Sequence, residues 1–270
     1  MEYLRLSQNH QKNLHLWVFG LSLAFNFVGF NKQALAEVSP PVIVFAAASL
    51  KSALDPLTQS YLQKTGQEIL VSYGSSAAMA RQILAGAPAH IYLSAAPNWM
   101  DFLSQEGLLA EETRQNLLRN ELLLLAYDKD EKPLDLTNPT LVLARLAGKT
   151  IATGHRKAVP LGAYGAQALG YLHLWETLAS QLVPMENASA AFNMVELGQT
   201  DFAIAYNSDA LSAQHAHIIA KFPPESHDTI IYPMALVKTA TNKIASAFFT
   251  FLNSPDAQVV FTNQGFQVLD

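Results

Sequence analysis

The chain has 270 residues, of which 50% are hydrophobic and 14% charged, and it contains no cysteine. These proportions exclude an intrinsically disordered chain. The missing cysteine excludes disulfides, thiolate metal sites and cysteine nucleophiles. A net charge of −5, without any Lys/Arg run, argues against binding nucleic acid through its phosphates.

The N-terminus has the pattern of a secretory signal peptide. Arg5 and Lys12 precede an apolar stretch at residues 16–25, and the small pair Ala34 and Ala36 follows at cleavage-site spacing. The apolar core is shorter than the roughly 20 residues that span a bilayer. We expect cleavage after Ala36 and a soluble periplasmic product; an uncleaved anchor is the alternative. Cleavage takes three positive charges and one negative charge from the net −5 and leaves −7.

Apolar runs then alternate with segments of helical periodicity. The expected strands lie at residues 42–47, 69–73, 90–94, 121–127, 150–153, 182–185 and 201–206, with an extended run at 229–238. The expected helices lie at residues 50–61, 77–84, 97–105, 161–169, 188–197, 243–252 and 255–264. Pro56 predicts a kink or a late start in the first helix. The alternation predicts an α/β fold with mainly parallel sheets flanked by helices.

Two such series in one chain predict two lobes with a ligand cleft between them. We place the signal peptide at residues 1–36, lobe I at residues 37–119 and 230–270, and lobe II at residues 120–229. The terminal helices would then rejoin the first lobe.

Hydroxyl and small residues stand where expected strands end and helices begin. Ser49 follows the first strand, and Ser75 and Ser76 follow the second through Gly74. In open α/β sheets ligands collect at this edge, where helix N-termini offer N–H groups to an anion. Plain helix capping by serine is the alternative. Tyr206 ends another strand, and satisfaction of its hydroxyl inside the protein is the default expectation.

Two further helix starts belong to the same pattern. Leu161 follows Pro160, which fits the first position of a helix, and Ala188 opens another helix. Each would aim backbone amides outward; a helix start without a ligand is the alternative.

Motifs in chain order resemble the periplasmic molybdate-binding proteins of ABC importers. They lie at residues 44–50 (VFAAASL), 72–76 (SYGSS), 80–83, 86–89, 94–95, 99–101, 159–164, 203–210 and 232–233. The resemblance covers essentially all of the chain after the signal peptide, and the first motifs are specific in combination.

The resemblance implies the type II periplasmic binding-protein fold, two α/β lobes that close on an oxyanion. It implies that the ion is held by the hydroxyls of Ser49, Ser76 and Tyr206 and by the amides of Leu161 and Ala188. Leu161 and Ala188 depart from the alanine and valine associated with those places, which backbone donors tolerate. Molybdenum would be bound only as the oxyanion through these groups, without a cofactor.

The implied function is that of an exported solute-binding protein, a monomer and not an enzyme. It would capture molybdate, or tungstate, and deliver it to the membrane permease of an ABC importer. A fully deprotonated oxyanion offers only acceptors, so a site of donors suits it, whereas the proton of phosphate would lack a partner. Sulfate passes this test, so one alternative is the same scaffold with another oxyanion, such as sulfate, or a small organic acid.

The alternative from a different class is an exported serine hydrolase. Ser49 or Ser76 would be its nucleophile, and His90 or His155 would be the general base that such a nucleophile needs.

Overall fold

The computed structural model describes residues 40–240 and 242–269. The predicted signal peptide and its cleavage site lie outside these residues. None of the helices formed by the described residues has the length and apolar character needed to span a membrane.

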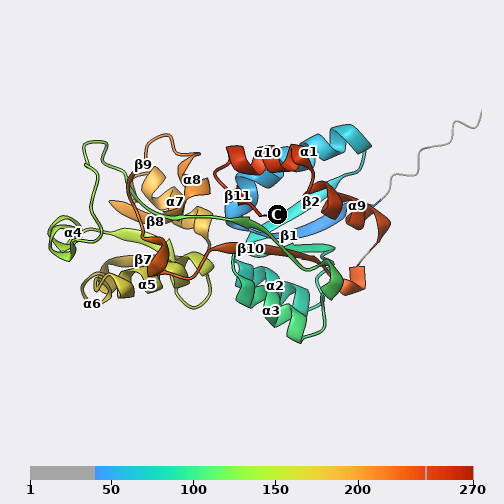
Figure 1. Ribbon diagram of the computed structural model, residues 1–270, viewed down its shortest axis with the longest axis horizontal. Helices are drawn as coiled ribbons and strands as arrows, with labels where there is room; N and C mark the ends of the chain where they lie inside the picture. Colours follow the sequence, from blue (N-terminus) through green and yellow to red (C-terminus); the bar gives the residue numbers. More distant parts are fainter. Residues whose placement is uncertain (1–39, 241, 270) are drawn as a thin grey trace, which may run out of the picture. The chain divides into compact units, whose positions relative to one another are not determined.

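The first lobe is built on a sheet whose strands come from both ends of the described chain (Figure 1). Its strands are β1 (Val42–Ala47), β2 (Ile69–Gly74), β3 (Ile91–Leu93), β4 (Gln115–Arg119), β10 (Ile231–Leu236) and β11 (Gln267–Val268). Their order across the sheet is β11-β4-β10-β3-β1-β2.

The second lobe is built on a sheet from the middle of the chain. Its strands are β5 (Leu122–Ala126), β6 (Ile151–Gly154), β7 (Leu182–Met185), β8 (Phe202–Tyr206) and β9 (His217–Lys221). Their order is β7-β6-β8-β5-β9. Every residue of β5 and β8 is buried, as expected for strands covered on both faces.

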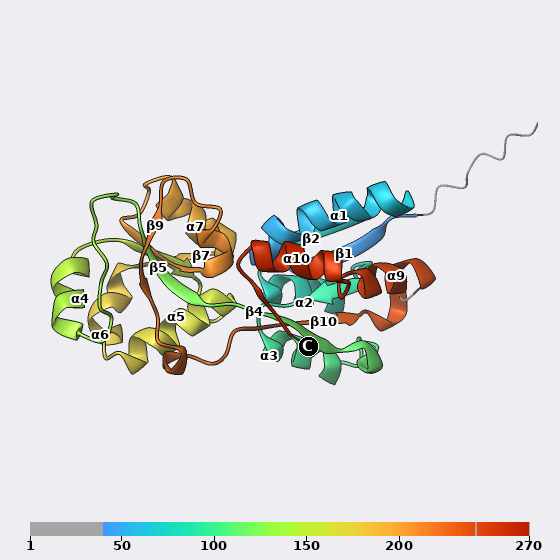
Figure 2. The same cartoon turned by 45° about the horizontal axis from the view of Figure 1, so that its top comes forward.

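Both sheets are mixed, which corrects the expectation of mainly parallel sheets. β1 pairs in parallel with β2 and β3, and β6 with β7 and β8. β10 pairs antiparallel with β3 and β4, and β5 with β8 and β9. The reason is that the chain leaves the first sheet after β4 and returns to it at β10, and these crossing strands run against their neighbours (Figure 2). The predicted lobe boundaries near residues 119 and 229 stay predictions.

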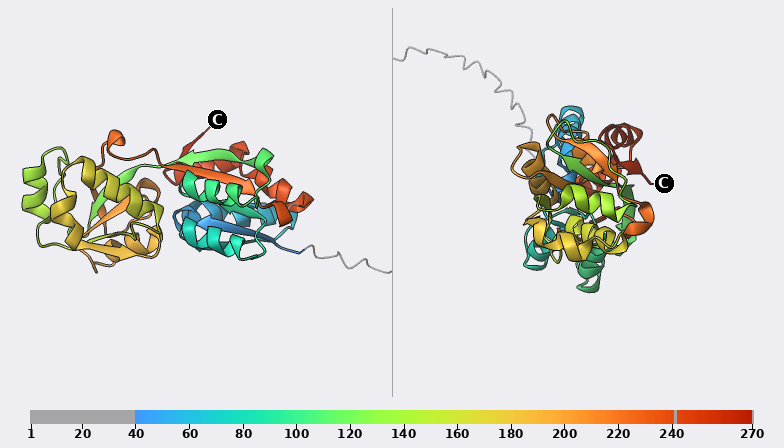
Figure 3. Two further views of the ribbon diagram at one scale, coloured as in Figure 1. Left: turned by 90° about the horizontal axis from the view of Figure 1, so that it is seen from below. Right: turned by 90° about the vertical axis from the view of Figure 1, so that its left-hand side faces the viewer.

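Helices flank both sheets (Figure 3). They are α1 (Lys51–Thr65), α2 (Ser76–Leu84), α3 (Pro97–Gln105), α4 (Pro139–Leu146), α5 (Pro160–Tyr171), α6 (Trp175–Leu178), α7 (Ala188–Glu196), α8 (Asn207–Ala210), α9 (Lys243–Phe251) and α10 (Pro255–Asn263). The shorter 3₁₀ turns are η1 (Ala48–Leu50), η2 (Glu111–Thr113), η3 (Ala179–Gln181), η4 (Pro224–Ser226) and η5 (Lys238–Ala240).

Alternate side chains of β1 reach the helices on the two faces of the first sheet. Val44 belongs to the apolar cluster on the side of α1 and α10, and Phe45 to the cluster on the side of α2 and α3. The C-terminal helices pack beside α1 (Figure 1), where the ring of Tyr61 lies 5.0 Å from those of Phe248 and Phe251. The end of the chain is therefore part of the first lobe's core.

The expected late start of the first helix is wrong, because α1 begins at Lys51 and continues through Pro56. Pro56 is exposed and lies in the second turn, where its missing N–H costs the helix one bond. Leu54 and Leu57 are buried on the opposite face and hold the helix to the sheet.

Helix α5 begins in close contact with the end of β6. A Cβ atom built on Gly162 would lie 2.0 Å from the carbonyl oxygen of Gly154. No side chain fits this distance, so the first turn of α5 keeps its place only with glycine at position 162.

We expect Gly162→Ala to lower the free energy of unfolding by about 3 kcal/mol or more, because the added methyl meets backbone atoms that have no room to move. Gly170→Ala is the matched control, since Gly170 lies in the same helix with nothing within 4 Å of a built Cβ. That control should gain about 0.5–1 kcal/mol. Urea unfolding measures both, and equal stability of the two variants would contradict the close contact.

Candidate functional site

The first turns of η1, α2, α5 and α7 meet at one small cavity between the lobes. It is lined by Ala47, Ala48, Ser49, Gly74, Ser75, Ser76, Ala95, Val159, Pro160, Leu161, Ala188 and Tyr206. All the residues predicted to hold an oxyanion are among these, and their role as ligands stays a prediction. They come together because each follows or ends a strand whose carboxyl end faces the cleft.

The cavity is small and has no charged side chain in its described lining. It measures about 10 Å³. Pockets for organic ligands usually have about 300 Å³ or more, whereas this cavity has room for about one water molecule.

The serines at the cavity have different bonds. Ser75 caps α2, since its Oγ accepts a bond from the amide of Ala78 at 3.2 Å, so the capping alternative holds for this residue. Ser76 does not cap the helix: its Oγ accepts from the amide of Ala95 at 2.9 Å. The Oγ of Ser49 lies 2.9 Å from the hydroxyl of Tyr232.

The amides of Leu161 and Ala188 belong to helix first turns. Leu161 follows Pro160 at the start of α5, and Ala188 is the first residue of α7. Asn187 is the N-cap residue of α7, and its side chain accepts a hydrogen bond from the amide of Ala190. The Asn187 side chain therefore does not occupy the amide of Ala188. First-turn amides have no partner within their helix, so both are available at the cavity these residues line.

Tyr206 is the unusual group of the site. The residue is 0% exposed, and its hydroxyl oxygen has no hydrogen-bond partner in residues 40–240 and 242–269. The default expectation, that this hydroxyl finds a hydrogen-bond partner inside the protein, is therefore wrong. Burial raises the pKa of Tyr206 well above its ordinary value, so the hydroxyl keeps its proton and is a donor at neutral pH. A buried hydroxyl without a partner costs about 1–3 kcal/mol, which a ligand accepting its proton would recover.

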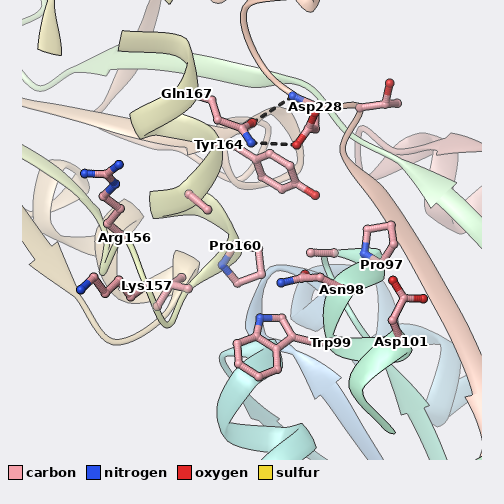
Figure 4. A pocket seen from close by; sticks show the side chains of 14 residues that line it. Pro97, Asn98, Trp99, Asp101, Arg156, Lys157, Pro160, Tyr164, Gln167 and Asp228 are labelled. Carbon is pink, nitrogen blue, oxygen red and sulfur yellow. Dashed lines mark hydrogen bonds between the residues drawn. The ribbon is translucent and has the colours of Figure 1, made fainter. Parts of the chain in front are cut away.

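A second, larger cavity measures about 480 Å³ (Figure 4). The two share Val159 and Pro160 in their linings. Arg156 and Lys157 line the larger cavity, and Trp99 lies across it in Figure 4. These two cations, which lie close to Val159 in sequence, therefore line the larger cavity and not the small one.

The histidines considered as general bases are not placed for that role. His90 precedes β3, and its Nδ1 accepts from the amide of Ile43 at 3.0 Å, at the opposite end of the sheet from Ser49 and Ser76. The Nδ1 of His155 accepts from the amide of Lys157 at 3.3 Å, outside the small cavity. The described residues thus give neither serine a histidine partner, which counts against the hydrolase alternative.

Residues 42–267 match the family of bacterial extracellular solute-binding proteins. The chain belongs to this family. The molybdate-binding protein ModA of Escherichia coli K12 is 34% identical over 250 residues, which cover 92% of this chain and 96% of that protein. ModA of Haemophilus influenzae is 33% identical over 241 residues, which cover 88% of this chain and 93% of that protein.

A solved structure confirms the fold of this solute-binding protein. The periplasmic molybdate-binding protein of Azotobacter vinelandii superimposes with a TM-score of 0.74 at 22% identity, over 85% of this chain and 100% of that one. The predicted two-lobed α/β fold is thereby confirmed.

Tyr206→Phe removes the hydroxyl that has no partner, and we expect it to raise the free energy of unfolding of the ligand-free protein by about 1 kcal/mol or more. Tyr92→Phe is the control, because the Tyr92 hydroxyl is equally buried but donates to the carbonyl of Ser76 at 2.8 Å. That change should lower stability by about 1 kcal/mol. Urea unfolding decides: a loss of stability in Tyr206→Phe as large as in the control would mean that the protein satisfies the Tyr206 hydroxyl.

Asp209 lies beside Tyr206 and is 7% exposed. Burial raises the pKa of Asp209 from 3.8 to about 7, although its Oδ2 accepts from the amide of Tyr206 at 3.4 Å. The folded protein therefore holds a proton that the unfolded chain releases, and stability falls as the pH rises from about 4 to about 7. We expect Asp209→Asn to remove this fall, and the variant to gain up to about 4 kcal/mol on the wild type across that range.

Urea unfolding at several pH values measures this difference. Asp130→Asn is the control for the same change of side chain, because Asp130 is exposed. If the free energy of unfolding depended on pH in the same way in the wild type and in Asp209→Asn, the folded protein would not hold a proton on Asp209.

Proposed function

We propose that this protein captures molybdate, or tungstate, in the small cavity and delivers it to the membrane permease of an ABC importer. The observation that carries the proposal is the buried Tyr206 hydroxyl, which lacks a partner in the described chain and stands at a cavity of donors. The printed names of the Escherichia coli and Haemophilus influenzae relatives support the choice of ion.

The proposed contacts are the hydroxyls of Ser49, Ser76 and Tyr206 and the amides of Leu161 and Ala188. All are neutral donors, and the partial positive charges of the helix N-termini replace a cationic side chain. A fully deprotonated tetrahedral oxyanion accepts from all of them. Hydrogen phosphate carries a proton that finds no carboxylate in the lining of this cavity.

Sulfate offers the same acceptors as molybdate, so we propose that the size of the cavity separates them. Contacts between the lobes set that size. Ser189 in α7 donates its hydroxyl to the carbonyl of Ala48 at 3.0 Å, and Tyr164 in α5 donates to the carbonyl of Ala95 at 3.4 Å. These bonds hold the second lobe against the first, as hinge closure around a ligand requires.

We further propose that the protein acts as a periplasmic monomer after removal of residues 1–36, with lobes divided near residues 119 and 229. Binding and release are its whole action, without a chemical step. Its partners are the ion and the permease, and nucleic acid is not among them.

Thermal unfolding with molybdate, tungstate, sulfate and phosphate, each in turn, tests the proposal. A ligand at about 1,000 times its Kd adds roughly 4 kcal/mol, which raises Tm by about 8–16 °C for a protein of this size. We expect this rise with molybdate and tungstate. A rise with sulfate instead would change the ligand, and no rise with any ion would overturn the proposal.

Ser76→Ala should weaken molybdate binding about tenfold or more in isothermal titration, because one hydrogen bond to the charged ion is lost. The control is Ser60→Ala in α1, which lies outside the lining of the cavity. Equal affinity of both variants for molybdate would remove Ser76 from the site.

A further inference from the structure

A series of hydrogen bonds leads from the crossing between the lobes to Ser49. It starts at Asn120, which lies between β4 and β5 and is 8% exposed. Asn120 Oδ1 accepts from the amide of Glu121 at 2.9 Å, which fixes the orientation of the side-chain amide. The NH₂ group therefore faces the other way and donates to Ser208 Oγ at 2.9 Å and to Tyr232 Oη at 3.3 Å.

The bond from Asn120 determines which way the proton of Tyr232 points. Tyr232 is 0% exposed, and Ser49 Oγ, at 2.9 Å, is the acceptor that the described residues offer to its hydroxyl. If Ser49 donated to Tyr232 instead, the phenol proton would be buried without an acceptor. The favoured direction is therefore from Asn120 to Tyr232 and from Tyr232 to Ser49.

Ser49 then has one proton left to give. Its oxygen already accepts from Tyr232, and no other bond of its hydroxyl is present in the described part of the chain. Ser49 is 3% exposed and lines the small cavity, so its proton is directed there. The Oγ of Ser76 likewise accepts a hydrogen bond, from the amide of Ala95. This donor belongs to the backbone, so substitution of a side chain does not remove it.

We propose that Tyr232 and Asn120 are positioning residues that make Ser49 a donor to the bound ion, and that this direction of bonds selects fully deprotonated oxyanions. The inference rests on the proposed function and adds the origin of its selectivity. Without the Tyr232 hydroxyl, both lone pairs of Ser49 Oγ are free and its proton is no longer oriented, so Ser49 turns more easily to accept a proton from a ligand. The site then loses part of its discrimination against protonated ions.

The test compares the affinities of molybdate, sulfate and phosphate at pH 8, by isothermal titration and by competition against molybdate. At this pH phosphate is mainly hydrogen phosphate, doubly charged like the other ions but still carrying a proton. Because both ions carry the same charge, a change in the ratio of molybdate to phosphate affinity measures the effect of the proton on phosphate. We expect Tyr232→Phe to lower this ratio about tenfold, the value of one hydrogen bond to a charged group.

Asn120→Asp gives a second measurement on the same bonds. Its carboxylate would accept from Tyr232, which reverses the direction of the bonds and makes Ser49 donate to Tyr232 instead of to the ion. The added negative charge weakens all three ions together, so the ratio of molybdate to phosphate affinity still isolates the direction. We expect that ratio to fall at least as far as in Tyr232→Phe.

Tyr92→Phe is the matched control, because the Tyr92 hydroxyl is equally buried but donates to the Ser76 carbonyl and not to a hydroxyl facing the ion. Its ratio should equal that of the wild type. An unchanged ratio in both Tyr232→Phe and Asn120→Asp, with a wild type that prefers molybdate, overturns the role of these residues alone. A wild type that binds none of the ions overturns the proposed function, and this role with it.

Discussion

Parallel strands in both lobes, β1 and β2 in the first and β6 and β7 in the second, end at the same cleft. A helical turn follows each of them, so the first turns of η1, α2, α5 and α7 face one point. Their amides have no partners inside the helices, and the partial charges there are positive. In the proposed anion site the two sheets thus supply backbone donors, and the hydroxyls of Ser49, Ser76 and Tyr206 add to them.

A site of neutral donors depends on where protons point, which is set by groups outside it. Ser76 is held by a backbone amide, and Ser49 by Tyr232, a residue from the strand β10 that returns from the second lobe. Asn120 stands where the chain first leaves for that lobe. Both crossings of the chain between the lobes therefore contribute to the orientation of one hydroxyl. In this arrangement the crossings between the lobes and the proposed binding site share a hydrogen-bond network.

The sequence predicted most strands and helices because their apolar runs and spacing are local signals, as in β1 and α3. It missed β9, whose residues His217–Lys221 alternate weakly, and β11, which has only two residues. It also missed β4, α4, α6 and α8. The candidate site residues could be proposed from the sequence because they follow or end strands. The partner of Ser49 could not, because Tyr232 is 183 residues away and nothing in a local pattern pairs them. The free hydroxyl of Tyr206 likewise emerges only from three-dimensional packing.

The neutral lining of the small cavity has an electrical consequence. The described lining offers no charged side chain to neutralise an ion bound there, so the negative charge of that ion adds to a chain that is already acidic. Loaded and unloaded molecules then differ in electrophoretic mobility and isoelectric point. Any acidic or basic docking partner meets two electrically distinct particles. The presence or absence of the ion therefore changes the electrostatic field around the protein, and this field acts on a partner before any side chains touch.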